Sequence, residues 1–319
     1  MIFTQSAFLL LSRPATLDQI QERLEGKYEI LGRTEGDPDT FWAFGSPALV
    51  LQLGDELEGR LIIDAVEERW ADDAGDPEGN PGLFAAWNLG AFGPGAAPGC
   101  LERAGQQAWA WKQASAAVRG HRALIRLRTT WVTEDEEQPL PEDYDPRKEL
   151  LLLTQVASEI AELREVMCWF NPNGESLRPP GFVREALDHH LTDDEWPLDV
   201  WTNVRVSKLP IEGDWMLMDT VGMPQIRRPD VEILFPQGRF ALEQVDRFAR
   251  DLCAYLVEAG NVLDDGHTVD GPDETTWMVL KIAHPLGEPD RPVLRFVPAG
   301  VDVPTALLAR GSHNGSGAA

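Results

Sequence analysis

Cysteine is scarce in this sequence, and the few cysteines are scattered. Among 319 residues there are three, Cys100, Cys168 and Cys253, and no two are spaced as Cys-x-x-Cys. An odd number without paired spacing indicates neither a disulfide framework nor a zinc knuckle. A reducing compartment fits best, so we expect a cytoplasmic protein that needs no metal and no cofactor.

The amino terminus lacks the features of a targeting segment. The stretch MIFTQSAFLLLSRP has no cationic segment ahead of its apolar core. The core itself, AFLLL, is too short for a signal peptide or a membrane span. We therefore expect a first strand here, and no membrane partner.

Positive charge is in short supply. Lys and Arg number 28 against 53 Asp and Glu, which gives a formal net charge of −25. Such a chain repels polyanions and anionic membranes and attracts basic macromolecules. We expect a basic protein partner and no nucleic acid.

Recognisable catalytic motifs are also missing. The chain has no G-x-S-x-G elbow and no Gly-rich phosphate loop beside its basic strand. His189 and His190 are adjacent, and neighbours on a helix point about 100° apart, which is unsuited to chelating one ion. The segment NVLDDGHTVDG lacks the ligand register of a calcium loop. We expect no catalytic residue and no metal site.

Hydrophobic periodicity predicts an α+β protein with two lobes of mostly antiparallel sheet covered by helices. Thr16 and Gln19 form a capping box for an early helix, and ALEQVDRFARDLCAYLVEAG has a continuous apolar face closed by Gly260. The breaker-rich segment GAFGPGAAPG predicts a boundary between the lobes. We expect lobes at 1–90 and 100–305 and a disordered tail at 306–319.

The segment from Gly105 to Trp131 predicts a helix that leads into a strand. From residue 121 the period is two, with Ala123, Ile125 and Leu127 on one face. The other face carries a basic stripe, Arg122, Arg126 and Arg128. These arginines either pair with the protein's own carboxylates or, together with His121, form a site for an anionic ligand.

Three blocks resemble the bacterial domain of unknown function 4261, over roughly residues 104–297. They are QQAWAWKQASAAVRGHRALIRL, VMCWFNPNGESLRPPGF, and WMLMDTVGMPQIRRPDVEILFP with its following helix and DDGHTVDG. The sequence departs from the family pattern in the turn that carries Arg227 and Arg228. The resemblance implies a fold and no reaction, and it implies a loose association with polymorphic toxin loci.

Two functions from different classes remain open. The first is a non-catalytic acidic binding protein, for example an immunity protein that sequesters a basic, cytoplasm-acting toxin. Its candidate partner-binding residues are two tryptophans among acids: Trp70 with Glu67, Glu68, Asp72 and Asp73, and Trp196 with Asp193, Asp194 and Glu195. Either tryptophan could instead pack back onto its own lobe. The alternative is an enzyme or small-ligand sensor at His121, Arg122, Arg126 and Arg128.

Overall fold

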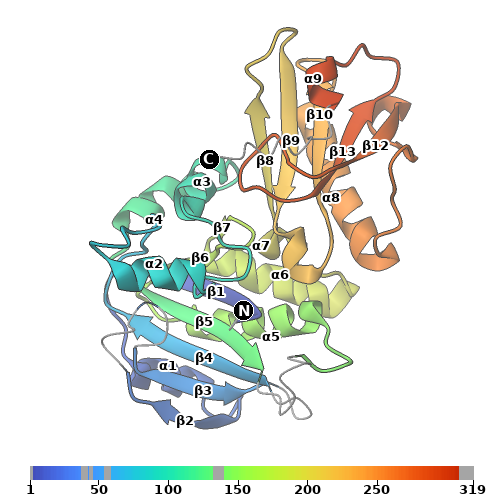
Figure 1. Ribbon diagram of the computed structural model, residues 1–319. Coiled ribbons are helices and arrows are strands. Elements are labelled where there is room, and N and C mark those ends of the chain that lie inside the picture. Colours follow the sequence, from blue (N-terminus) through green and yellow to red (C-terminus); the bar gives the residue numbers. More distant parts are fainter. Residues whose placement is uncertain (1–2, 37–41, 43–45, 54–58, 132–139, 309–319) are drawn as a thin grey trace. The chain divides into compact units, whose positions relative to one another are not determined.

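The computed structural model describes residues 3–36, 42, 46–53, 59–131 and 140–308. The chain divides into two compact units, Met1–Asn203 and Val204–Ala319. One sheet has seven strands and the other has six, and helices cover both (Figure 1). The predicted α+β class with two mostly antiparallel sheets is confirmed.

The seven-stranded sheet belongs to unit 1, and all of its neighbouring strands are antiparallel. The order is β2-β3-β4-β5-β1-β6-β7. The strands are β1 (Gln5–Leu11), β2 (Ile30–Thr34), β3 (Ala48–Gln52), β4 (Gly59–Val66), β5 (Ala123–Trp131), β6 (Val166–Asn171) and β7 (Ser176–Arg178). Every residue of β1 is buried, as expected for a central strand between two partners.

Strand β1, from the first expected lobe, pairs with two strands of the second expected lobe. Phe8 of β1 lies opposite Arg126 of β5 on one side and opposite Phe170 of β6 on the other. Strands from residues 1–90 and strands from beyond residue 100 therefore share one sheet. The expected boundary at residues 90–100 does not coincide with the division of the structure, which falls at residues 203 and 204.

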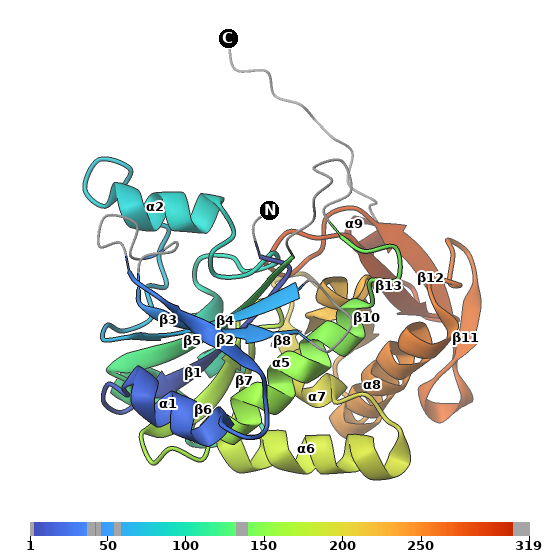
Figure 2. The same cartoon turned by 90° about the horizontal axis from the view of Figure 1, so that it is seen from below.

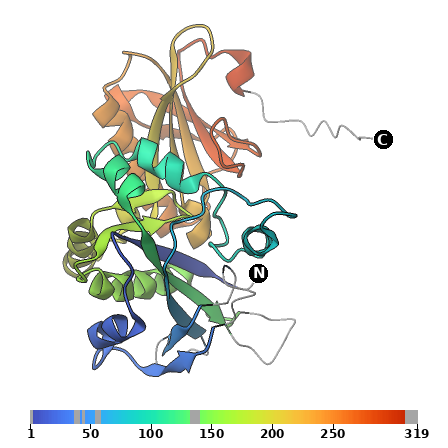
Figure 3. The same ribbon diagram turned by 90° about the vertical axis from the view of Figure 1, so that its left-hand side faces the viewer.

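Helices cover both faces of this sheet (Figures 2 and 3). On one face lie α1 (Leu17–Leu24), α5 (Pro146–Ile160) and α6 (Pro180–Asp193), with α5 against β1, β5, α1 and α6. The predicted capping box of α1 is present, since Thr16 Oγ1 accepts from Gln19 N at 3.2 Å. The opposite face carries α2 (Pro81–Asn88), α3 (Cys100–Gln107) and α4 (Ala114–Gly120), and α7 (Leu198–Trp201) packs near β7.

Unit 2 holds the six-stranded sheet, in the order β11-β12-β13-β10-β9-β8. Its strands are β8 (Asn203–Lys208), β9 (Trp215–Val221), β10 (Asp230–Pro236), β11 (Thr268–Asp270), β12 (Thr276–Ile282) and β13 (Val293–Pro298). β10 is antiparallel to β9 and parallel to β13. The predicted amphipathic helix is α8 (Leu242–Ala259), which packs on β9 and β10 and ends at Gly260, where φ is +83°.

Short helical segments complete unit 2. They are η2 (Met223–Ile226), η3 (Pro272–Glu274) and α9 (Thr305–Leu308). Leu307 of α9 is buried in an apolar cluster with Trp215 and Leu234. Residues 306–308 of the expected tail are therefore helical, and residues 309–319 lie outside the described residues.

Candidate functional site

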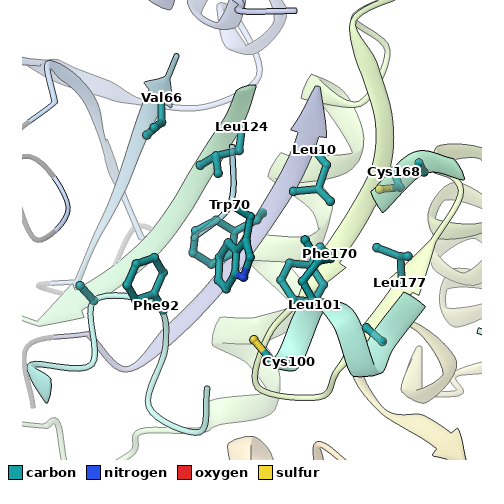
Figure 4. Packing of buried hydrophobic residues seen from close by; sticks show 14 of the residues in the cluster. Leu10, Val66, Trp70, Phe92, Cys100, Leu101, Leu124, Cys168, Phe170 and Leu177 are labelled. Carbon is teal, nitrogen blue, oxygen red and sulfur yellow. The ribbon is translucent and has the colours of Figure 1, made fainter. Parts of the chain in front are cut away.

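Trp70 lies in the core of unit 1. Its side chain is 6% exposed and sits among aromatic rings on the face of the sheet that α2, α3 and α4 cover (Figure 4). The ring centroids of Phe8, Phe92, Phe170 and Trp87 lie 4.8–5.9 Å away, and all four rings are edge to face with Trp70. Trp70 is thus not an exposed aromatic group for a partner, and it corresponds to the alternative in which the ring packs back on its own unit.

The acids near Trp70 divide into structural and exposed residues. Asp72 accepts Trp70 Nε1 at 3.0 Å and the backbone amides of Leu101 and Glu102 at 3.0 and 2.7 Å. It therefore caps the start of α3 and fixes the indole ring. Exposed side chains remain at three positions: Glu67, Glu68 and Asp73.

Trp196 is half-buried, and its ring contacts its own unit. The Arg147 guanidinium lies 5.2 Å from the ring centroid, and the rings of His190 and Trp201 lie 5.3 and 5.9 Å away. Asp145 holds Arg147 through two side-chain hydrogen bonds at 3.0 and 2.7 Å. The neighbouring acids Asp193, Asp194 and Glu195 are all exposed.

A residue that the sequence analysis did not select stands among those acids. Leu191 is 75% exposed, the largest value among the exposed large hydrophobic residues of the described chain. Helix α6 continues to Asp193, beyond its last buried position, Leu187. Leu191 follows Leu187 at helical spacing, which is the one signal the sequence offered.

The basic stripe on β5 is internal. Ile125 and Leu127 face one side and Arg126 and Arg128 the other, as the alternation predicts, but both arginines are buried. Asp64 of β4 lies opposite Arg126 and accepts its Nε at 2.9 Å. Arg126 Nη1 also donates to the carbonyl oxygen of Trp42 at 2.7 Å.

Arg128 shares the same carboxylate. Its Nη2 lies 3.4 Å from Asp64 Oδ1, and its guanidinium lies 4.3 Å from the centroid of the Phe3 ring. Burial, and next the charge of Arg126, lower the pKa of Arg128 to about 9. These contacts match the interpretation that the stripe pairs with the protein's own carboxylate, and only Arg122 of the three arginines is exposed.

His121 is buried and bonded on both ring nitrogens. Nδ1 lies 2.6 Å from the carbonyl oxygen of Val118, and Nε2 lies 3.0 Å from the backbone nitrogen of Trp70. A carbonyl only accepts and an amide only donates, so the ring is neutral with its proton on Nδ1. This ring connects α4 to the segment that carries Trp70, and it is not placed to act as an accessible base.

The stability of unit 1 is expected to fall in mild acid because of His121. Burial lowers the pKa of His121 below its usual 6.5, with Arg69 and Arg122 also lowering it and Val118 and Asp72 opposing. The unfolded state then binds the proton first, so stability is complete above about pH 6.5 and decreases as pH falls toward the lowered folded pKa. Urea unfolding between pH 7.5 and 5.5 measures how the free energy of unfolding depends on pH.

The variant His121→Gln should show a smaller decrease in the free energy of unfolding with falling pH than the wild type. The variant His189→Gln, at an exposed position, should show the same decrease as the wild type. An equal decrease in all three proteins would contradict the role given to His121.

The three cysteines are buried and offer no reactive thiol. Burial raises the pKa of Cys253 to about 12 and raises those of Cys100 and Cys168 as well. Within the described ranges, no three His, Cys, Asp or Glu side chains are placed to hold a metal ion. No helix in the same ranges is long and apolar enough to cross a bilayer.

Unit 2 contains a buried charge network that the sequence analysis missed. Asp230, at the start of β10, accepts from Thr220 Oγ1 at 2.9 Å, from Met223 N at 3.1 Å and from Arg291 Nε at 2.8 Å. Burial raises the pKa of Asp230, although Arg291 opposes the shift. Arg291 Nη2 donates further to Asp219 Oδ2 at 3.0 Å.

The network fixes the loops at one end of the sheet. Asp219 also pairs with Arg205, and Glu232 pairs with Arg295 at 2.6 Å. Glu232 Oε1 accepts from Leu286 N at 2.6 Å, so the loop before β13 is bonded to β10. The signal in the sequence was the alternation of acids in DVEILF, which places Asp230 and Glu232 on one face.

Most of the buried charge network of unit 2 lies in a segment that matches a known protein family. Residues 219–297 match the family Domain of unknown function (DUF4261). The match begins at Asp219 in β9 and ends at Val297 in β13, in the C-terminal part of the range in which the resemblance was seen. Five of the buried charged side chains lie inside the DUF4261 segment: Asp219, Asp230, Glu232, Arg291 and Arg295. No curated protein and no solved structure matches the chain.

Proposed function

We propose that this is a non-catalytic acidic protein that binds a basic protein partner. The observation that carries the proposal is the acidic end of α6, which we define as Asp188, Leu191, Asp193, Asp194 and Glu195. All five side chains are exposed, and the leucine is the apolar residue that a partner would bury. Asp193 Oδ2 lies 3.3 Å from Nδ1 of His189, one turn earlier on the helix.

The two kinds of side chain have different effects on binding. Burial of Leu191 contributes affinity and slows dissociation, because apolar contacts carry much of the binding free energy. The carboxylates and the net charge of −25 accelerate association with a cationic surface and select against acidic partners. A basic toxin acting in the cytoplasm is one partner of this chemistry, and the protein would then serve as its immunity protein.

The alternative, an enzyme or ligand sensor at the basic stripe, receives less support. Arg126 and Arg128 are buried against Asp64, and both nitrogens of His121 are bonded to backbone groups. Arg122 is the stripe residue that is exposed. An anionic substrate at this place would need the pairing with Asp64 to break first.

The proposal predicts two separable effects on binding kinetics. The triple variant Asp193→Asn, Asp194→Asn, Glu195→Gln is expected to slow association about tenfold at low salt and to flatten its salt dependence. Leu191→Ser is expected to speed dissociation with little change in association. The partner is first captured from the native cell with the wild-type protein, and rates are then measured by surface plasmon resonance.

A matched control neutralises three acids elsewhere in unit 1. The variant Glu67→Gln, Glu68→Gln, Asp73→Asn removes the same charge from exposed positions. It should retain most of the association rate, since steering depends most on charges near the contact. The proposal is wrong if no basic protein is captured, or if the two triple variants bind alike.

A further inference from the structure

A hollow in unit 1 gathers arginines in a chain that has few of them. Its volume is about 530 Å³, and its lining includes Arg13, Arg23, Arg164, Glu22 and Glu165. Three segments build it: the residues after β1, the helix α1, and the turn between α5 and β6. The lining is thus net cationic, against an overall charge of −25.

Backbone contacts bring together the two segments that carry Arg13 and Arg164. Leu11 of β1 lies opposite Val166 of β6, and Ser12 N continues the ladder by donating to Glu165 O at 2.8 Å. Arg13 follows Ser12, and Arg164 precedes Glu165 in a turn that the Val166 N to Leu163 O hydrogen bond closes at 3.1 Å.

Carboxylates of the chain fix two of the guanidiniums without using all of their donors. Glu165 Oε1 accepts Arg13 Nε at 3.2 Å and Nη2 at 2.6 Å, which leaves Nη1 for a ligand. Glu162 accepts one nitrogen of Arg23, at 2.8 Å, and also pairs with Arg184. The side chain of Arg164 makes no hydrogen bond or ion pair with the described residues.

We propose that this hollow, which we call the arginine hollow, binds the phosphate group of a small molecule. A carboxylate has two oxygens and one charge and is satisfied by one guanidinium fork. The three arginines that line the hollow supply more donors and more positive charge than one carboxylate can use, and they suit the three terminal oxygens and the double charge of a phosphate. The volume exceeds what the phosphate alone requires, so a phosphate monoester fits better than the free ion. This site is independent of the binding of a basic protein at the acidic end of α6.

The test uses inorganic phosphate and phenyl phosphate as probes on the full chain. Binding is followed by amide NMR shifts and by thermal stability, against sodium chloride at equal ionic strength. We expect shifts at residues 12–13, 19–23 and 163–165 and a higher melting temperature, since a ligand of the folded state stabilises it. Tighter binding of phenyl phosphate indicates a monoester, and equal or weaker binding indicates free phosphate.

The variant Arg164→Gln should weaken phosphate binding about fivefold or more, because a charge-assisted contact is lost. Its own melting temperature should not fall, since a residue without an ion pair is replaced. Arg119→Gln removes an exposed arginine of α4 and should bind phosphate as the wild type does. The proposal is overturned if neither probe shifts these residues, or if both variants keep wild-type affinity.

Discussion

Trp70→Ala is expected to lower the free energy of unfolding by about 3–5 kcal/mol, the usual cost of truncating a buried aromatic residue. The substitution removes the ring around which Phe8, Phe92, Phe170 and Trp87 pack, and it removes the indole donor to Asp72. A cavity then opens between the sheet and the segment that covers it. Urea unfolding monitored by far-UV circular dichroism measures the loss.

The same substitution at an exposed tryptophan is the control. Trp109 is 53% exposed, so Trp109→Ala should change the free energy of unfolding by less than about 1 kcal/mol. A small loss at both positions would show that Trp70 does not hold the aromatic core together. The comparison also distinguishes a core residue from an exposed binding residue, because truncation of the latter barely alters stability.

Asp64→Ala is expected to cost about 3–5 kcal/mol, because removing one partner of a buried ion pair leaves the remaining charge uncompensated. Here one carboxylate faces two buried guanidiniums, those of Arg126 and Arg128. Its loss brings their mutual repulsion into effect as well. The measurement is again urea unfolding, at neutral pH.

Asp188→Ala serves as the control for Asp64→Ala. Asp188 is exposed on α6, and its removal should stay within about 0.5 kcal/mol of the wild type. If Asp64→Ala were equally mild, the arginines of β5 would have another source of compensation, and the basic stripe would again be a candidate for an anionic ligand.

Local patterns in the sequence predicted individual elements better than their assembly. The alternation from Ala123 to Arg128 gave the two faces of β5, and the capping box of α1 was visible as Thr16 and Gln19. The pairing of β1 with β5 and β6 joins residues more than a hundred positions apart, and no local pattern reports it. Breaker-rich composition at 90–99 therefore indicated a boundary that the sheet does not have.

The contacts of that segment show what its glycines do. The loop packs against the sheet, where Asn173 Oδ1 accepts from Gly95 N at 2.9 Å and Ser6 Oγ donates to Phe92 O at 2.9 Å. A Cβ on Gly93 would lie 2.3 Å from Ser6 Oγ, and its φ is +124°. Glycine is needed there because its backbone lies directly against the side chains of Ser6 and Asn173 and its φ is positive.

The exposure of the side chains in the candidate site could also not be predicted from local sequence patterns. Acids surround both Trp70 and Trp196 in the sequence, but composition does not reveal which way a ring points. The first ring faces the core, and Arg147 lies against the second. Leu191 is exposed because α6 continues beyond its last buried position, and that depends on where the core beneath it ends.

The family match and the proposed binding surface involve different parts of the chain. The DUF4261 segment contributes β9 to β13 and a buried network of arginines and carboxylates, whose contacts hold turns and loops in place. The acidic end of α6 belongs to unit 1, outside the match. Proteins that share only the DUF4261 segment are therefore not expected to share the partner.

Hydrogen exchange of the protein with its captured basic partner tests the central claim most directly. The account predicts slower exchange in peptides that cover residues 185–196, at the acidic end of α6, and unchanged exchange at residues 67–73. Protection confined to other surfaces, or a captured partner that is acidic, would contradict it.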